Sequence, residues 1–281
     1  MSDVLFDAPG PKAVRRHRLI AVATIAGLIL AAVAVVWKLA VEDQFTADKW
    51  EPFVTPGILE VLLEGLALTV FAAAVAIVIA VAFGVIFGVG KLSDHALLRW
   101  PSWAVVEFFR AVPLLMLIIF IWSIQDYPTD SLLPLIIGLI LYNGSVLAEV
   151  FRAGILAVPK GQAEAAYAIG MRKSQVMQII QLPQAVKIML PAIISQCIVA
   201  LKDTSLGFYI LAPVLTAKGR EIWNFFDNKF ATAIVLAAVY IVLNLLLTWL
   251  ANWVERRISA TGGKVTIVAG QVQSQAEAGA L

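Results

Sequence analysis

The sequence predicts an all-α integral membrane protein with six transmembrane helices, and three observations support this prediction. Hydrophobic residues make up 61% of the 281 residues and charged residues only 14%, which leaves too little polar surface for a soluble domain. Long charge-free runs recur along the chain, and Lys and Arg gather in alternate loops between them. The net charge of +2 is too small to indicate a nucleic-acid-binding protein.

Charge-free runs locate the spans, because a helix needs about 20 mainly apolar residues to cross the hydrocarbon core. Four runs fit with little or no help: Leu19–Trp37, Gly65–Gly90, Ser131–Ala148 and Phe230–Val254. The run Ala111–Gln125 has 15 residues and must borrow residues on its N-terminal side. We expect one helix across it, with Glu107 and Arg110 in or near the inner leaflet.

Two further runs of 14 residues, Ile188–Leu201 and Thr204–Ala217, are too short for each to span the membrane. We therefore expect a single helix from Pro191 to about Leu211, with Lys202 and Asp203 inside it. This helix is the fifth of the six spans.

The first span resembles a signal peptide in its basic start, but its apolar run exceeds the usual ~7–15 residues. No clean small-x-small cleavage site follows Lys38. We expect a retained helix at residues 19–41, after a cytoplasmic tail at residues 1–18. Residues 256–281 contain Gly262-Gly263 and a polar end, and we expect a disordered cytoplasmic tail there.

The short loops orient the chain, because cytoplasmic loops carry the excess of Lys and Arg. With both termini inside, five basic residues lie outside: Lys38, Lys49, Lys218, Arg220 and Lys229. The cytoplasmic side then holds 15: Lys12, Arg15, Arg16, Arg18, Lys91, Arg99, Arg110, Arg152, Lys160, Arg172, Lys173, Lys187, Arg256, Arg257 and Lys264. The opposite orientation reverses this ratio, so the sequence predicts an N-in, C-in protein.

The segment Gly161–Pro183 (GQAEAAYAIGMRKSQVMQIIQLP) is polar in an otherwise apolar chain and lies in a predicted cytoplasmic loop, residues 156–185. Its first part is rich in Ala, Gln and Glu, which favours helix. Gly170 interrupts that helix, and Met171–Leu182 can form a second one that Pro183 ends or kinks. We expect a helix–Gly–helix elbow. It can dock a thin Ala-rich helix into a groove of another protein, or rest as an amphipathic connector on lipid headgroups.

The elbow also carries a recognisable pattern. Its fixed positions are Glu164-Ala165-Ala166, Gly170 and Ile180-x-Leu182-Pro183, preceded by Gly161. This pattern resembles the cytoplasmic "EAA" motif of permease subunits of ATP-binding-cassette (ABC) importers. VEFFRAVPLL (residues 106–115), AEVFRAGI (148–155) and LKDTSL (201–206) are similar to segments of the polar amino acid permeases. Ala111-Val112 departs from that family, which usually has Gly-Thr there. The N-terminal segment is most similar to actinobacterial glutamate permeases.

The resemblance implies a type I ABC importer permease core of five helices at residues 57–255, after the extra N-terminal helix. It implies a translocation subunit in a bacterial plasma membrane, for glutamate or another polar amino acid. The implied partners are a second permease subunit, identical or different, two ATP-binding-cassette ATPases and an external binding protein. The elbow's first helix becomes a coupling helix that docks on the ATPase.

The chain itself is not expected to be an enzyme. The phosphate-binding pattern G-x-x-x-x-G-K-[ST] is missing from it, so ATP and Mg²⁺ are expected on the partner ATPase. Cys197 is the only cysteine and His17 and His95 are isolated, so we expect no metal site. A secondary transporter, or a membrane assembly protein without substrate flux, remains the alternative.

Polar residues inside the spans are candidates for the substrate pathway, because an ionisable group there is costly. Lys202 can meet the carboxylate of an amino acid, or it can bond Asp203, another carboxylate or backbone carbonyls. Thr204 and Ser205 can line the pathway or bond back to the preceding helical turn. Asn143 can bond across helices.

Two i,i+3 pairs lie at the predicted inner boundary, Glu107 with Arg110 and Glu149 with Arg152. Each pair can meet on one helix face. They are either neutralised anchors at the membrane surface or a polar cluster at the cytoplasmic mouth of the pathway.

Overall fold

The computed structural model describes residues 10–124, 127–128 and 130–260, and every regular element in these ranges is helical. The first half contains α1 (Pro11–Val41), α2 (Ala47–Trp50), the 3₁₀ helix η1 (Glu51–Val54), α3 (Pro56–Gly90), α4 (Ala96–Ala111), α5 (Leu114–Ile124) and α6 (Leu133–Leu156). The second half contains α7 (Lys160–Ala168), α8 (Lys173–Gln175), the π-helical turn η2 (Val176–Gln181), α9 (Leu182–Asp203), the 3₁₀ helix η3 (Thr204–Ile210), α10 (Leu215–Phe226) and α11 (Lys229–Ala260).

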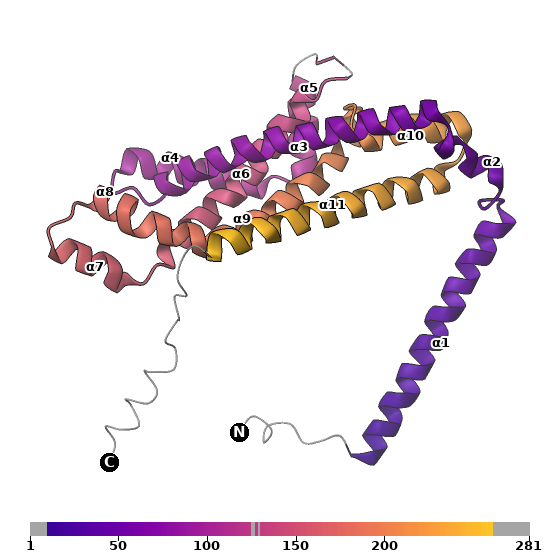
Figure 1. Cartoon of the computed structure of the whole chain (residues 1–281), viewed down its shortest axis with the longest axis horizontal. Helices are drawn as coiled ribbons and strands as arrows, with labels where there is room; N and C mark the ends of the chain where they lie inside the picture. The colour runs from indigo at the N-terminus through magenta and orange to yellow at the C-terminus, as the bar shows by residue number, and fades with distance from the viewer. Residues whose placement is uncertain (1–9, 125–126, 129, 261–281) are drawn as a thin grey trace.

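The long helices form an elongated bundle in which α3, α6, α9 and α11 lie side by side (Figure 1). The elbow lies at one end of the bundle, and α2 and α10 lie at the other. Five of the described helical segments are long and apolar enough to cross a membrane, and a sixth span results if the bent pair α4–α5 counts as one. The all-α membrane fold predicted from composition is confirmed, while the orientation of the bundle stays a prediction.

Helices α3 and α6 approach closely because one face of α3 carries only small side chains. Buried Gly, Ala and Thr recur every three or four residues along it, at Gly65, Thr69, Ala72, Ala73, Ala76, Ala80, Gly84 and Gly88. A Cβ added at Gly84 would come within 2.8 Å of the Leu147 side chain. One added at Gly88 would lie 2.7 Å from the Ala148 carbonyl oxygen. Small residues permit such contacts between membrane helices, and they fix α6 against α3.

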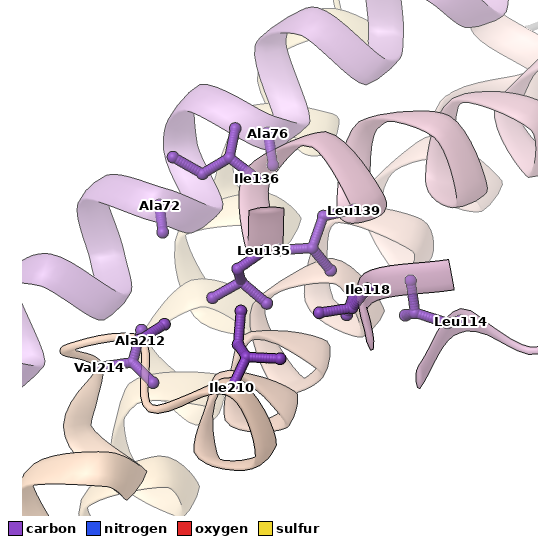
Figure 2. Packing of buried hydrophobic residues seen from close by; sticks show 10 residues of the cluster. All are labelled: Ala72, Ala76, Leu114, Ile118, Leu135, Ile136, Leu139, Ile210, Ala212 and Val214. Atoms are coloured by element: carbon purple, nitrogen blue, oxygen red, sulfur yellow. The ribbon is translucent and has the colours of Figure 1, made fainter. Parts of the chain in front are cut away.

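A cluster of buried apolar side chains joins four parts of the chain (Figure 2). Ala72 and Ala76 come from α3, and Leu135, Ile136 and Leu139 from α6. Helix α5 contributes Leu114 and Ile118, while the chain at and after η3 contributes Ile210, Ala212 and Val214. The cluster therefore holds the irregular segment that follows α9 against the centre of the bundle.

The single unbroken helix expected across Ala111–Gln125 is not formed, because α4 and α5 are bent by 101° at a short break, although the two together can still count as one span. The break falls at Val112, whose backbone is extended (φ −79°, ψ 127°). Pro113 follows it, and the residue before a proline is disfavoured in the helical region. Glu107 and Arg110 consequently lie on α4, a separate helix that packs along α3 and α6.

The predicted fifth span, Pro191 to about Leu211, ends where the helical segment Lys173–Ile210 ends but starts too late. The continuous helix α9 begins at Leu182 and its 22 residues end at Asp203, a length sufficient to cross the hydrocarbon core. Pro183 does not end a helix: it occupies the first turn of α9, where its missing N–H costs little. Lys202 and Asp203 stand at the end of α9, and the 3₁₀ helix η3 continues the same helical segment to Ile210.

The two chain ends differ from the expected tails. Helix α1 already begins at Pro11, and none of its residues is buried, because it leaves the bundle (Figure 1). Helix α11 continues to Ala260, so residues 256–260 are helical, contrary to the disordered tail expected from residue 256. Residues 1–9 and 261–281 lie outside the described residues.

Candidate functional site

The elbow adopts the expected helix–Gly–helix shape. Helix α7 ends in a turn in which the Gly170 N–H donates to the Tyr167 carbonyl oxygen (2.9 Å) and the Met171 N–H to that of Ala166 (3.1 Å). Gly170 has φ +87°, the left-handed conformation that such a helix end requires and that glycine adopts at little cost. No atom lies within 4 Å of a Cβ added there, so the requirement is one of backbone conformation alone.

Most of α7 faces outward. Ala166 is buried, whereas Glu164, Ala165 and Gly161 are exposed. Ile169, just after α7, is 79% exposed. The helix thus offers a thin surface with one acidic side chain and an apolar end, which is suited to a partner's cleft.

The second half of the elbow anchors it to the bundle. Val176 is fully buried, and Met177 packs against the buried cluster around Phe151, Ala185 and Met189. Ile180 and Leu182 are half-buried and Pro183 is exposed. Helix α7 packs against η2, which runs directly into α9, so a displacement of α7 can pass to α9 through this contact.

Lys173 makes a further link between the elbow and the turn that joins α3 to α4. Its ammonium lies 2.5 Å from the Asp94 carboxylate. This ion pair holds the pKa of Asp94 below its usual range. Asp94 is fully exposed, so the link is weakened by solvent.

The two i,i+3 pairs predicted at the inner boundary both form, and the structure joins them. Arg110 lies 3.3 Å from Glu107, and Arg152 lies 2.9 Å from Glu149. The ammonium of Lys91, at the end of α3, bonds Glu107 at 3.1 Å and also contacts Glu149. Lys91 was not among the predicted site residues, since only the contact between α3, α4 and α6 brings it to both carboxylates.

At the other end of the bundle, α9, η3, α10 and α11 enclose a groove of about 740 Å³, called the polar groove below. Its polar lining includes Lys202, Ser205, Thr216, Tyr240, Asn244 and Thr248. Lys202 is exposed to this groove, and none of the ion pairs among the described residues involves it. The structure thus pairs Lys202 neither with Asp203 nor with a carboxylate on another helix.

The remaining predicted pathway residues point elsewhere. Asn143 is buried, donates to the Leu139 carbonyl oxygen (3.1 Å) and accepts from the Gln196 amide (2.6 Å). It therefore bonds across to α9, and its side chain also reaches the Asp203 carboxyl group. The buried Thr204 hydroxyl donates back to the Leu201 carbonyl oxygen (2.6 Å). Of the residues predicted for the pathway, only Lys202 and Ser205 line the polar groove.

Sequence reasoning missed the part of α11 that lines the polar groove. Tyr240, Asn244 and Thr248 follow one another at four-residue spacing in an otherwise apolar span, and that periodicity was a readable signal. The Tyr240 hydroxyl faces Thr69, Thr204 and Thr216 without a well-formed hydrogen bond. The side-chain amide oxygen (Oδ1) of Asn244 is likewise buried without a partner among the described residues. Unsatisfied groups of this kind are typical of functional sites.

Comparisons with known proteins agree with this architecture. Residues 80–260 match the family described as "Binding-protein-dependent transport system inner membrane component". The chain is 39% identical over 240 residues to the glutamate transport system permease protein GluD of Corynebacterium glutamicum, covering 82% of this chain and 87% of that one. It is 29% identical over 207 residues to the glutamate/aspartate import permease protein GltK of Escherichia coli O6:H1, covering 70% and 92%.

Solved structures show the same fold. An amino acid ABC transporter crystallised with histidines superposes with a TM-score of 0.66 at 29% identity, over 71% of this chain and 94% of that one. The methionine transporter MetNI, in an inward-facing form, gives a TM-score of 0.63 at 18% identity, over 73% and 99%. The resemblance stated from the elbow pattern is confirmed: this chain is a multi-pass plasma membrane protein that belongs to the family of inner-membrane permease components of binding-protein-dependent ABC transport systems.

Proposed function

We propose that this chain is the translocation subunit of an ATP-driven importer of acidic amino acids, with glutamate as its substrate. The observation that carries this proposal is Lys202, which lines the polar groove and forms no ion pair with any of the described residues. An ammonium group in such a position attracts a carboxylate, and hydrogen bonds to charged groups are stronger than neutral ones. The names of the two permeases described above, for glutamate and for glutamate and aspartate, support the same substrate class.

Substrate passage is driven from the elbow. Helix α7 docks on a separate ATPase subunit, which binds ATP and Mg²⁺, and η2 transmits the ATPase movement into α9 and so to Lys202. The exposed face of α7 and the continuous path from η2 into α9 support this coupling. A second permease subunit completes the pathway, and an external binding protein delivers the substrate.

The test is transport by the reconstituted complex. Proteoliposomes containing this chain, its partner permease and the ATPase, with the binding protein outside, should accumulate labelled glutamate only when ATP is present. Unlabelled aspartate should compete better than glutamine or arginine. Uptake without the ATPase would support a secondary transporter, and ATPase binding without any uptake would support an assembly protein.

Orientation is tested separately by cysteine labelling in a Cys197→Ala background. A cysteine at Ser93 or Ser174 should resist an impermeant external thiol reagent, because the positive-inside rule puts both positions in the cytoplasm. A cysteine at Thr46, which is exposed in the structure, should react from outside. The reverse labelling pattern would contradict docking of the elbow on a cytoplasmic ATPase.

A further inference from the structure

A second cavity lies at the elbow end of the bundle, far from the polar groove. It has a volume of about 660 Å³ and is called the basic notch below. Its lining consists of Lys91, Arg99, Arg152, Glu107, Glu149 and the pair Trp100–Trp103. These residues come from the end of α3, from α4 and from the last turns of α6, three helices that pack together at that end of the bundle (Figure 1).

The charges of the basic notch do not cancel. Three basic and two acidic side chains line it, and Arg110, which pairs with Glu107, adds a further cation, so basic groups outnumber acidic groups in the cluster. Lys91 is committed to the two carboxylates, and its side chain is only 6% exposed. The uncompensated charge therefore belongs to the arginines.

Both arginines keep hydrogen-bond donors for a ligand. Arg152 uses its Nε on Glu149, and Arg99 uses one Nη on the carbonyl oxygens of Ser93 and Asp94. A guanidinium carries five N–H donors, so each of the two has others left. Arginine is the side chain best suited to the planar, bidentate binding of phosphate groups.

The tryptophans indicate the physical state of the ligand. Trp100 is 65% exposed and Trp103 is 51% exposed, with ring centroids 6.4 Å apart. Exposed tryptophans are typical of the boundary between membrane and water, where the ring contacts the lipid and its N–H remains hydrated. A free inorganic phosphate would gain nothing from two apolar rings, whereas a phospholipid would bury its glycerol and upper acyl chains against them.

We propose that the basic notch binds the phosphodiester headgroup of an anionic phospholipid. The net positive charge of this cluster attracts the negative charge of a phosphatidylglycerol headgroup. Basic pockets between membrane helices at the cytoplasmic side are suited to such headgroups. Arg99 and Arg152 hold the phosphate, and Trp100 and Trp103 form the wall that receives the lipid backbone.

The experiment measures binding of phosphatidylglycerol to the full chain in its transporter complex. The complex is placed in phosphatidylcholine nanodiscs that contain increasing amounts of labelled phosphatidylglycerol. Arg99→Gln is the main variant, because Arg99 bonds only loop carbonyl oxygens and lies outside the Lys91 network. Arg256→Gln is the matched control, since Arg256 is an exposed cation near the end of α11 that does not line the notch.

We expect saturable binding of phosphatidylglycerol to the wild type. Arg99→Gln should weaken this binding about fivefold, which is the effect of one basic residue near an anionic surface. Arg256→Gln should leave the binding unchanged. Trp100→Ala should weaken binding as well, which covers the case in which Arg99→Gln does not fold. Equal losses in Arg99→Gln and Arg256→Gln would overturn the proposal, because binding would then follow overall charge. Displacement of the lipid by millimolar glycerol phosphate would overturn it too, in favour of a soluble phosphate ester.

Discussion

Lys91 and Lys202 lie toward opposite ends of the same bundle and have opposite surroundings. Lys91 is almost completely covered and contacts two carboxylates on two other helices. Lys202 faces a polar groove and has no carboxylate partner among the described residues. A buried charge is tolerated when it is paired, and removing its partner is costly. The comparison therefore assigns a structural role to Lys91 and leaves Lys202 available for a substrate.

Lys91→Met should have the largest effect on stability. It would leave Glu107 and Glu149 close together without their shared counter-charge, at a cost of about 3 kcal/mol. We expect lower abundance in the membrane and a clearly lower unfolding temperature in detergent. Lys38→Met is the control, because the Lys38–Glu42 pair is an exposed i,i+4 pair, and exposed ion pairs contribute little to stability.

A second substitution sharpens the test of Lys91. Glu149→Gln in the Lys91→Met background should restore part of the lost stability, since it removes one of the two neighbouring carboxylates that have lost their shared lysine. If Lys91→Met lowered the unfolding temperature no more than Lys38→Met does, the structural role assigned to Lys91 would be wrong.

Lys202→Met should abolish transport without destabilising the protein. A charge-assisted contact is worth about 1.5–3 kcal/mol, so glutamate uptake should fall at least tenfold. Abundance, and substrate binding by the external protein, should stay as in the wild type. Basal ATPase activity should persist while its stimulation by substrate is lost.

The double variant Lys202→Met/Asp203→Asn tests the competing explanation for Lys202. The Asp203 carboxyl group lies near Asn143 and forms no ion pair with Lys202, so neutralising it should not restore uptake. Rescue of uptake by Asp203→Asn would defeat the proposed role of Lys202. Lys202→Arg should keep partial activity, because it retains the charge but replaces the compact ammonium with a planar fork.

Gly170→Val should uncouple the ATPase from transport at the Lys91 end of the bundle. A left-handed conformation costs a residue with a Cβ about 1–2 kcal/mol, which is enough to displace α7. We expect uptake to fall far more than abundance, measured in the same vesicles. Gly57→Val is the matched control, because Gly57 in the first turn of α3 also has open space but no positive φ and lies outside the elbow; equal losses of uptake in both variants would rule out the turn as the cause.

The smallest expected effect concerns pH and the Asp94–Lys173 pair. Lys173, with smaller effects from His95 and Arg99, lowers the pKa of Asp94 in the folded protein. The contribution of this ion pair to the stability of the folded protein is therefore fully present above the ordinary Asp pKa of about 3.9. It disappears as the pH falls through the lowered pKa of Asp94. Hydrogen exchange of residues 173–181 should show a slight loss of protection below pH 4 in the wild type. The same loss in Asp94→Asn would show that another group titrates.

The elements that could be predicted from the sequence depend on local patterns. The spans of α3, α6 and α11 follow from long charge-free runs, and the turn at Gly170 follows from a glycine between two helix-favouring segments. The α4–α5 bend was missed although Pro113 signals it, because the length of the run was weighed above the proline. The fifth span was predicted to start too late because Lys187, which interrupts the charge-free run, lies within the helical part of α9.

The composition and order of the residues by themselves determined that this chain is helical, lies in a membrane and carries an elbow of the EAA type. Each of these features depends on neighbours in sequence: apolar length, basic loops, or a glycine at a helix end. Only the tertiary structure decided that Lys91 joins two carboxylates, that Tyr240 and Asn244 share a groove with Lys202, and that Asp203 does not neutralise that lysine. Those facts depend on how α3, α6, α9 and α11 cross, and this crossing is set by the small-residue face of α3 and the close packing that it permits. The role of a charged side chain can be assigned only when its partners in space are known.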